Sequence, residues 1–326
     1  MTASVAAGLS GDSGWILTAA TLVVAGLLLV PGWIVGRAAR LAALPSLAVA
    51  PALGSAIIAA AEILAHTLAL PWLPWGWAVI AGLTAVVALM ARLLVGAPPE
   101  RARRAASPGR AEWAILAAGL SVAVALPAGV ILSVLPSPGY PAQAFDATFH
   151  LNAVAAIREG GNASMLGGLS ALYSGRAVYY PTVWHGAVAL APGSPAPVST
   201  AGVLALTAVV WPLSLLGLLA RATGLDATRA SEMDRVRRRQ RACAVAAVLA
   251  LSAAVVGFPL LPMTALAVWP YALSVAGLPG VLVLYDQLRQ ETASWRLRLT
   301  LVLLTLAAAG GVVAAHGTGL FNLAVL

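Results

Sequence analysis

Eight apolar stretches of about 20 residues constrain the fold of this chain more than any other feature. They cover residues 14–35, 41–65, 75–94, 112–135, 198–220, 242–258, 268–285 and 299–315. As helix, this length crosses a hydrocarbon core of roughly 30 Å, and a spanning segment must satisfy its own backbone hydrogen bonds. Only 9% of the residues are charged, too few to cover a water-facing surface. The sequence therefore predicts an all-α, polytopic transmembrane helix bundle of about eight spans.

The arginines indicate how this bundle is oriented. All 19 basic residues are arginines. Of these, 17 lie at the connections that follow the first, third, fifth and seventh spans, in the segments 36–40, 92–111, 221–241 and 286–298. Short loops rich in arginine stay in the cytoplasm, so we expect a multi-pass protein of the plasma (inner) membrane with its N-terminus outside. This placement also argues against nucleic acid as a partner. The absence of lysine is typical of a GC-rich genome, such as those of actinobacteria.

Three regions follow from this topology. Residues 1–135 hold four transmembrane helices, 136–197 form a long extracytoplasmic loop, and 198–326 hold four further helices. Because the last residues turn apolar again after 316, we expect the chain to continue in a longer protein. A loop as long as 136–197 is uncommon without structure of its own, so we expect it to be partly folded and functional.

The loop contains an amphipathic pattern. Phe145, Phe149 and Ala153 recur at helical spacing, and two glycines at 160–161 end the pattern. We therefore predict an interfacial helix over 145–159 that lies along the membrane surface.

Two chemically active residues share one face of this predicted helix. Asp146 and His150 are four residues apart. A carboxylate beside an imidazole can act as a base, orient the histidine, or hold a metal. Both are therefore candidate catalytic residues, and also candidate ligands of a divalent cation such as Mg, Mn, Ca or Zn. The alternative is structural: Asp146 caps the helix and His150 packs against lipid headgroups.

The histidines and an aromatic cluster extend this candidate site. The segment 179–185 reads YYPTVWH, which fits either an interfacial aromatic belt or a binding site that includes His185. The predicted topology places all four histidines outside, including His66 and His316. Glu62 lies within the second span; an intramembrane carboxylate is a functional candidate, although this one can also snorkel to the surface.

Three segments carry a resemblance to a known group of proteins: 145–152 (FDATFHLN), 161–164 (GNAS) and 179–185 (YYPTVWH). There the chain resembles large actinobacterial multi-spanning membrane proteins associated with the C-type (GT-C) glycosyltransferase superfamily. That superfamily uses polyprenyl-phosphate sugars and keeps a catalytic acid in an extracytoplasmic loop. In typical members this loop follows the first span, whereas here it follows the fourth.

The resemblance implies roles for individual residues. Asp146 would be the catalytic base, and His150 would assist it or help to hold a cation. Tyr180 and His185 would line the sugar pocket, and Arg158 or Arg176 would pair with the donor phosphate. The remaining candidates for substrate binding are Asn152 and His316.

The leading hypothesis is thus a membrane glycosyltransferase. It would move a sugar from a polyprenyl-phosphate donor to an envelope glycan or protein acceptor on the outer face. No nucleotide-binding motif such as GxxxxGK[ST] is present, which disfavours a nucleotide-driven pump. The alternatives are a transporter or flippase, for which Glu62 and the proline-interrupted spans would be the basis, and a non-catalytic scaffold for envelope assembly.

Overall fold

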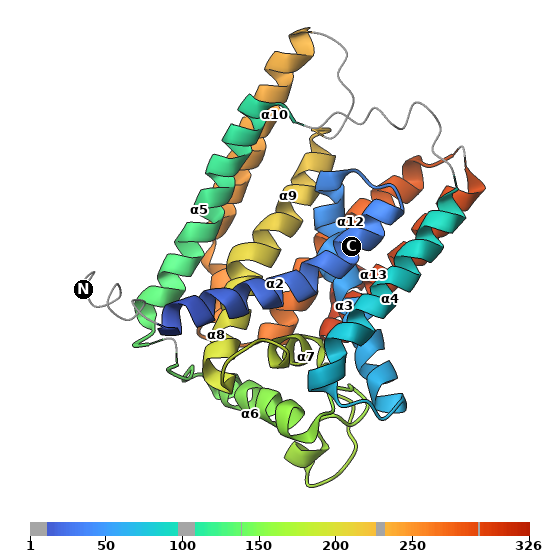
Figure 1. Ribbon diagram of the computed structural model, residues 1–326. Helices are drawn as coiled ribbons and strands as arrows, with labels where there is room; N and C mark the ends of the chain where they lie inside the picture. Colours follow the sequence, from blue (N-terminus) through green and yellow to red (C-terminus); the bar gives the residue numbers. More distant parts are fainter. Residues whose placement is uncertain (1–11, 97–107, 138, 226–231, 293) are drawn as a thin grey trace.

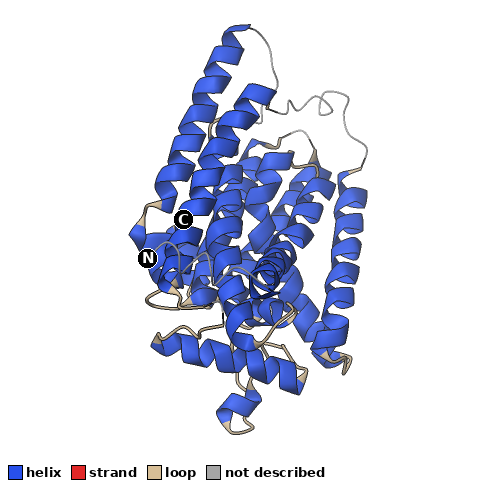
Figure 2. Cartoon of the chain, turned by 60° about the vertical axis from the view of Figure 1, so that its left-hand side comes forward, coloured by secondary structure: helices blue, strands red, loops and turns tan. Residues whose placement is uncertain are grey.

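The computed structural model describes residues 12–96, 108–137, 139–225, 232–292 and 294–326, and these residues form helices and loops with no strand among them (Figure 2). The all-α prediction is therefore confirmed. The long helices are α2 (Asp12–Ala38), α3 (Ala43–Thr67), α4 (Trp72–Val95), α5 (Arg110–Val134), α10 (Glu232–Ala253), α12 (Trp269–Gln290) and α13 (Trp295–Ala315). One further long stretch consists of α8 (Pro195–Leu204), the π-helical turn η3 (Ala205–Val210) and α9 (Trp211–Ala222).

Seven described helices are long and apolar enough to cross a membrane, which confirms the multi-pass prediction. They are Gly14–Ala38, Ala43–Thr67, Trp72–Val95, Arg110–Val134, Pro195–Ala222, Trp269–Gln290 and Trp295–Ala315. The bent pair Val236–Ala253 and Val256–Met263, which turns by 51°, makes an eighth if it counts as one span. Each predicted stretch therefore coincides with one of these helices.

Helix α10 begins earlier than the sequence predicted. Its apolar part starts near residue 242, but the helix starts at Glu232 and includes the arginine-rich run. The Arg238 guanidinium is buried, donates to the Leu225 carbonyl at 3.1 Å, and lies 3.8 Å from the Glu112 carboxylate of α5. These contacts attach the charged end of α10 to α5, and the two helices run side by side in Figure 1.

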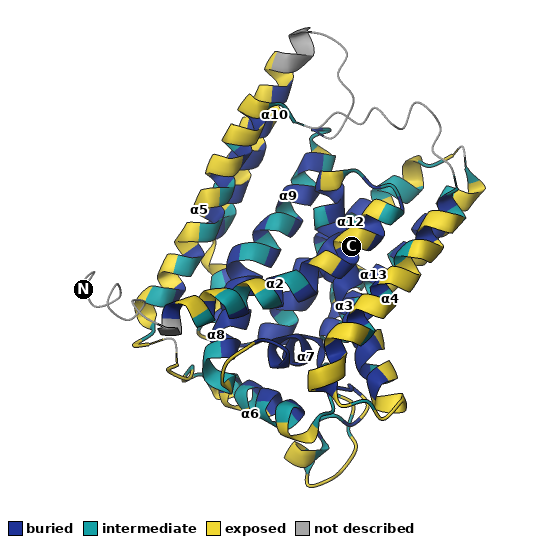
Figure 3. Ribbon diagram, viewed as in Figure 1, coloured by how far each residue is buried: buried dark blue, intermediate teal, exposed yellow. Residues whose placement is uncertain are grey.

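Helix α3 is the centre of the larger helix group, and glycines on its neighbours allow the close approach. A Cβ added at Gly32 of α2 would lie 2.2 Å from the Ala50 carbonyl oxygen, and one at Gly311 of α13 would lie 1.9 Å from that of Ala52. Small residues that let backbones touch are typical of helix contacts in membranes. Figure 3 shows the outcome: α3 is mostly buried, whereas α4 and α5 expose one side.

Three shorter helical segments lie at one end of the bundle, in addition to η4 (Val256–Leu260), α11 (Leu261–Met263) and α14 (Gly319–Val325). Helix α6 (Phe145–Gly160), the 3₁₀ turn η2 (Ser170–Tyr173) and helix α7 (Val183–Ala189) belong to the 136–197 segment. In Figure 1, α6 lies across the end of the bundle away from the first turns of α5 and α10. The start of α5, which carries Arg110, thus lies at the end of the bundle opposite α6. Arg101, Arg103, Arg104 and Arg229, which contributed to the predicted topology, lie outside the described residues.

Candidate functional site

Helix α6 forms where the sequence predicted a helix, and one of its faces packs on the bundle. It ends at Gly160, and Gly161 adopts φ +65°, a left-handed conformation that ends helices well. The buried residues are Ala147, His150, Ala153, Val154 and Ile157. Of the predicted apolar stripe, Ala153 is buried, Phe149 is partly buried and Phe145 is exposed. That this stripe lies along a membrane surface stays a prediction.

The first turn of α6 holds Phe145 and Asp146. Phe145 is 93% exposed. Asp146 lies in the first turn and is half-buried, and the N-cap position is held by Ala144 without a side-chain hydrogen bond. The alternative interpretation of Asp146 as the helix cap is thus not what the structure shows.

Helix α7 is buried along its whole length, so its part of the segment 179–185 does not form an exposed aromatic belt. It packs on α3 through Glu62, whose Oε2 accepts a hydrogen bond from Thr182 Oγ1 at 2.8 Å. Trp72 Nε1 donates to the Gly186 carbonyl at 2.9 Å, and a Cβ at Gly186 would lie 2.0 Å from Glu62 Oε1. Glu62 is only 1% exposed, so it supports α7 rather than snorkelling to the surface.

The packing of α6 on α7 joins two of the predicted histidines. His150 Nδ1 and His185 Nε2 are 2.8 Å apart, and both rings are buried. At this distance one nitrogen carries the proton and donates, while the other accepts. Trp269 lies against His150 with 5.2 Å between ring centroids, and Tyr180 lies against His185 at 5.7 Å. A tightly packed aromatic cage therefore fixes the histidine pair.

Burial keeps both imidazoles uncharged at neutral pH. Loss of solvent lowers the pKa of His150 to about 4, with a smaller contribution from His316, while the Ala267 carbonyl opposes the shift. The pKa of His185 is lowered well below its ordinary range by burial and by His150, against the opposing Pro181 carbonyl. The pair is therefore suited to donate and accept neutral hydrogen bonds, not to carry a positive charge.

Acidification is expected to destabilise the fold between about pH 6.5 and about pH 4. The unfolded chain protonates His150 near its ordinary pKa of 6.5, whereas the folded protein protonates it only near 4. The unfolded state thus binds more protons in this window, so the free energy of unfolding decreases as the pH is lowered through it. Thermal unfolding measured across the window should show a shallower pH dependence in His150→Asn. The exposed His66 provides the control, since His66→Asn should keep the wild-type slope; equal slopes in all three proteins would contradict the prediction.

One cavity collects most of the candidate residues. It has a volume of about 590 Å³ and is lined by Phe145, Asp146, Thr148, Phe149, His150, Asn152, Tyr173, Tyr180, Val268, Pro270 and His316. The volume is in the range typical of small-molecule sites. An antiparallel bridge between Leu166 and Tyr179 holds the two arms of the loop together, with the Tyr180 N–H donating to the Met165 carbonyl at 3.0 Å. Five predicted site residues thus face one space.

The other predicted residues lie elsewhere. His185 lies behind His150 and does not line the cavity. The Arg158 guanidinium donates to the carbonyls of Ala189, Ala191 and Gly193, so it fastens α6 to the segment after α7. Its pairing with a donor phosphate, as the resemblance implied, would require these three bonds to break. Arg176 is exposed and outside the cavity lining.

The segment before α12 was not predicted to take part. Val268 and Pro270 line the cavity, and Trp269 supports His150 from the side. The sequence places these residues more than a hundred positions from α6, and the only local signal was a tryptophan–proline pair at the start of a span. A proline at the first helical turn marks a helix start, but it does not reveal what that start contacts.

The predicted metal site gains no further ligands. In the described ranges, no three His, Cys, Asp or Glu residues are close enough together to hold a metal ion. His150 Nδ1 is already engaged by His185, and no hydrogen bond or ion pair joins Asp146 to His150 in the described part of the chain. A divalent cation on Asp146 and His150 stays a prediction that would need water or substrate oxygens to complete it.

Comparison with known proteins gives one match. The sequence profile of DUF6541, described as a family of unknown function, matches residues 25–326. No curated protein and no solved structure matches the chain.

Proposed function

The chain belongs to the DUF6541 family, whose function is unknown, and we propose that it is a glycosyltransferase that uses a polyprenyl-phosphate sugar. The observation that carries this proposal is the cavity beside α6. It holds a half-buried carboxylate, a neutral imidazole, an amide and aromatic rings at one end of a transmembrane bundle. A lipid-linked donor can present its sugar to such a site without leaving the membrane.

Asp146 is the proposed general base. Among the described residues it has no ion-pair or hydrogen-bond partner, so its oxygens are available to a substrate. The carboxylate takes the proton from an acceptor hydroxyl, whose oxygen attacks the anomeric carbon of the donor sugar. The bond from that carbon to the phosphate oxygen breaks, and the polyprenyl phosphate leaves with the electron pair. A single displacement of this kind inverts the anomeric centre.

The other lining residues bind and orient the sugar. Phe149 and Tyr180, with 4.9 Å between ring centroids, present an aromatic corner for the apolar face of a pyranose. Asn152 and His316 offer hydrogen bonds to hydroxyls. His150 contributes through a neutral ring held by His185. The backbone N–H of Arg176 donates to the carbonyl of Tyr173, which lines the cavity. The Arg176 side chain is the proposed partner of the donor phosphate.

The activity is tested with the purified full chain in lipid nanodiscs. Radiolabelled polyprenyl-phosphate sugars are supplied one at a time, with envelope glycan and envelope protein fractions as acceptors. Label that moves covalently to an acceptor with release of polyprenyl phosphate supports the proposal. Failure of every donor to transfer, while the protein stays folded, would contradict it.

A transporter or flippase is the second candidate, because Glu62 is buried within span α3 beneath the site. The purified chain, reconstituted into sealed lipid vesicles with the same labelled donors, discriminates the two functions. Movement of labelled lipid or solute across the bilayer with no covalent product would favour transport. Covalent transfer without net movement would favour the enzyme.

We also propose that the cavity faces the extracytoplasmic side of the membrane. The only cysteine, Cys243, is exposed and is first replaced by serine. Single cysteines are then introduced at Asn152 and Arg239, which are both exposed. An impermeant maleimide added to intact cells should label position 152 but not 239, because arginine-rich loops stay in the cytoplasm. Labelling of 239 alone would invert the topology and rule out extracytoplasmic chemistry.

A further inference from the structure

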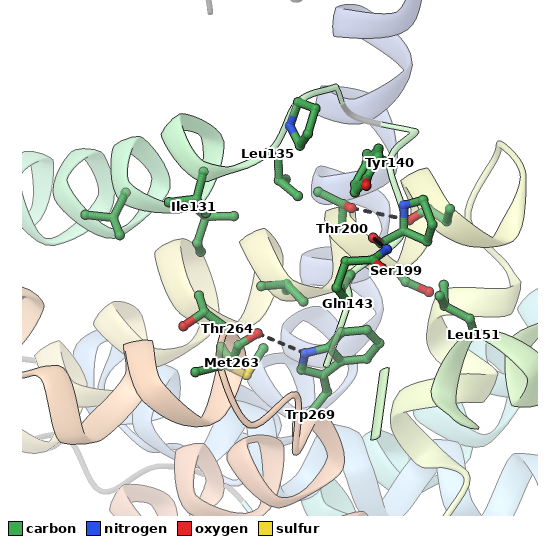
Figure 4. Close-up of a pocket in the computed structure, with 18 residues that line it drawn as sticks. Ile131, Leu135, Tyr140, Gln143, Leu151, Ser199, Thr200, Met263, Thr264 and Trp269 are labelled. Atoms are coloured by element: carbon green, nitrogen blue, oxygen red, sulfur yellow. Dashed lines mark hydrogen bonds between the residues drawn. The ribbon is translucent and has the colours of Figure 1, made fainter. Parts of the chain in front are cut away.

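A second cavity lies on the other side of α6 and differs in character from the first. Its volume is about 460 Å³, and mostly apolar side chains line it (Figure 4). Ile131 comes from the end of α5, Val203 from α8, and Met263 from α11 (Leu261–Met263). No residue of the proposed catalytic cavity lines it. It is therefore a separate site.

Polarity in this cavity changes with depth in the way that polarity changes along a lipid. Tyr140 and Gln143 line it from the loop before α6, outside the spans. Ser199 lies four residues after Pro195, the first residue of its span, or about 6 Å inward at 1.5 Å per residue. Val203 lies about 12 Å inward on the same scale. The cavity is thus polar at the headgroup level and apolar toward the bilayer centre.

Ser199 is the observation that points to a ligand. Its side chain is 1% exposed, lines the cavity, and its Oγ has no hydrogen-bond partner among the described residues. By contrast, Thr200 beside it donates to the Ala196 carbonyl at 3.3 Å. A buried hydroxyl without a partner is costly, so an acceptor atom on a bound molecule would satisfy it.

We propose that this cavity binds one acyl chain of a membrane phospholipid, with a glycerol ester carbonyl accepting from Ser199. The rim is open toward the lipid-facing side of α5, where Val130 is 37% and Val134 is 66% exposed. Phospholipid chains are the most abundant hydrocarbon at this depth, and occupancy follows concentration. The ester group of a phospholipid lies where hydrocarbon meets headgroup, which is the level of Ser199.

A bound chain would support the catalytic cavity from behind. Leu151 and Trp269 line the apolar cavity, whereas their chain neighbours His150 and Pro270 line the polar one. In α6 and in α12, adjacent residues therefore line different cavities, so these two helices form the wall between them. A chain pressed against Trp269 would hold this ring against His150.

The test uses a phosphatidylcholine whose acyl chain carries a diazirine, incorporated with the full chain into nanodiscs and activated by light. We expect crosslinks to concentrate on the cavity segments 131–135, 199–203 and 263–265. In Val130→Trp the indole occupies the rim, and these crosslinks should fall to background. Val122→Trp is the matched control, since Val122 is 47% exposed on the same helix and outside the cavity; it should crosslink like wild type. Ser199→Ala should reduce the crosslinks without removing them.

Two outcomes would overturn the proposal. Crosslinks spread evenly over the lipid-facing helices, or unchanged in Val130→Trp, would mean annular lipid only. Displacement of the labelled phospholipid by an equimolar polyprenol would assign the cavity to an isoprenoid chain instead.

Discussion

Asp146→Asn is expected to abolish sugar transfer while leaving the fold intact. The amide keeps the size and polarity of the carboxylate but cannot accept the acceptor's proton. A positioned general base contributes about 100- to 10,000-fold to rate, so the rate of sugar transfer should fall by that factor. Asp146 is half-buried and has no described partner, so the substitution breaks no internal contact. Initial rates with the active polyprenyl-phosphate donor measure the effect.

Glu159→Gln provides the matched control for this experiment. Glu159 is the other acid of the 136–197 loop, is exposed, lies at the far end of α6 and does not line the cavity. It should retain wild-type rates. The melting temperature of both variants should stay at the wild-type value. Full activity in Asp146→Asn would exclude this residue as the base and leave the cavity's carboxylate with a binding role.

Gly311→Ala is expected to cause the largest loss of stability from a single methyl group. A Cβ at this position would lie 1.9 Å from the Ala52 carbonyl oxygen and 2.9 Å from the Ala56 nitrogen. These are backbone atoms, so α13 must move away from α3. Overpacking of this kind costs about 1–3 kcal/mol, occasionally more. Thermal unfolding in detergent should show a clear fall in melting temperature.

The neighbouring glycine makes a stringent comparison. A Cβ at Gly310 would meet no atom within 4 Å. Gly310→Ala should therefore keep or raise the melting temperature, since alanine favours helix over glycine by up to about 1 kcal/mol. If both variants melt alike, α13 does not pack on α3 through this glycine.

The spans could be predicted because membrane solvent leaves a strong pattern in a single sequence. Each predicted stretch coincides with an apolar helix or with the bent pair. The start of α10 was misplaced because the helix continues past its apolar part, through a charged run that Glu112 and Leu225 stabilise. Apolar composition marks where hydrocarbon begins, not where helical hydrogen bonding ends.

Five of the candidate site residues line one cavity, but the sequence did not reveal how they are assembled, and their roles stay a prediction. Asp146 and His150 stood out through local spacing, and they do line one cavity. Their relation to Trp269 and His185 depends on how distant spans pack, and glycine contacts with α3 set that packing. The resemblance implied that Arg158 or Arg176 would pair with the donor phosphate. The three carbonyl partners of Arg158 appear only when the segment after α7 folds back.

The wall shared by α6 and α12 has a consequence for biosynthesis. Helix α6 is translated early, yet Trp269, which completes the cage around His150, follows more than a hundred residues later. In a nascent chain emerging from the insertion machinery, one side of the His150 ring therefore stays uncovered until α12 enters the bilayer. Fragments that stop after α9 should insert and remain inert, and co-expression of the missing half offers a way to reconstitute the pocket from two pieces.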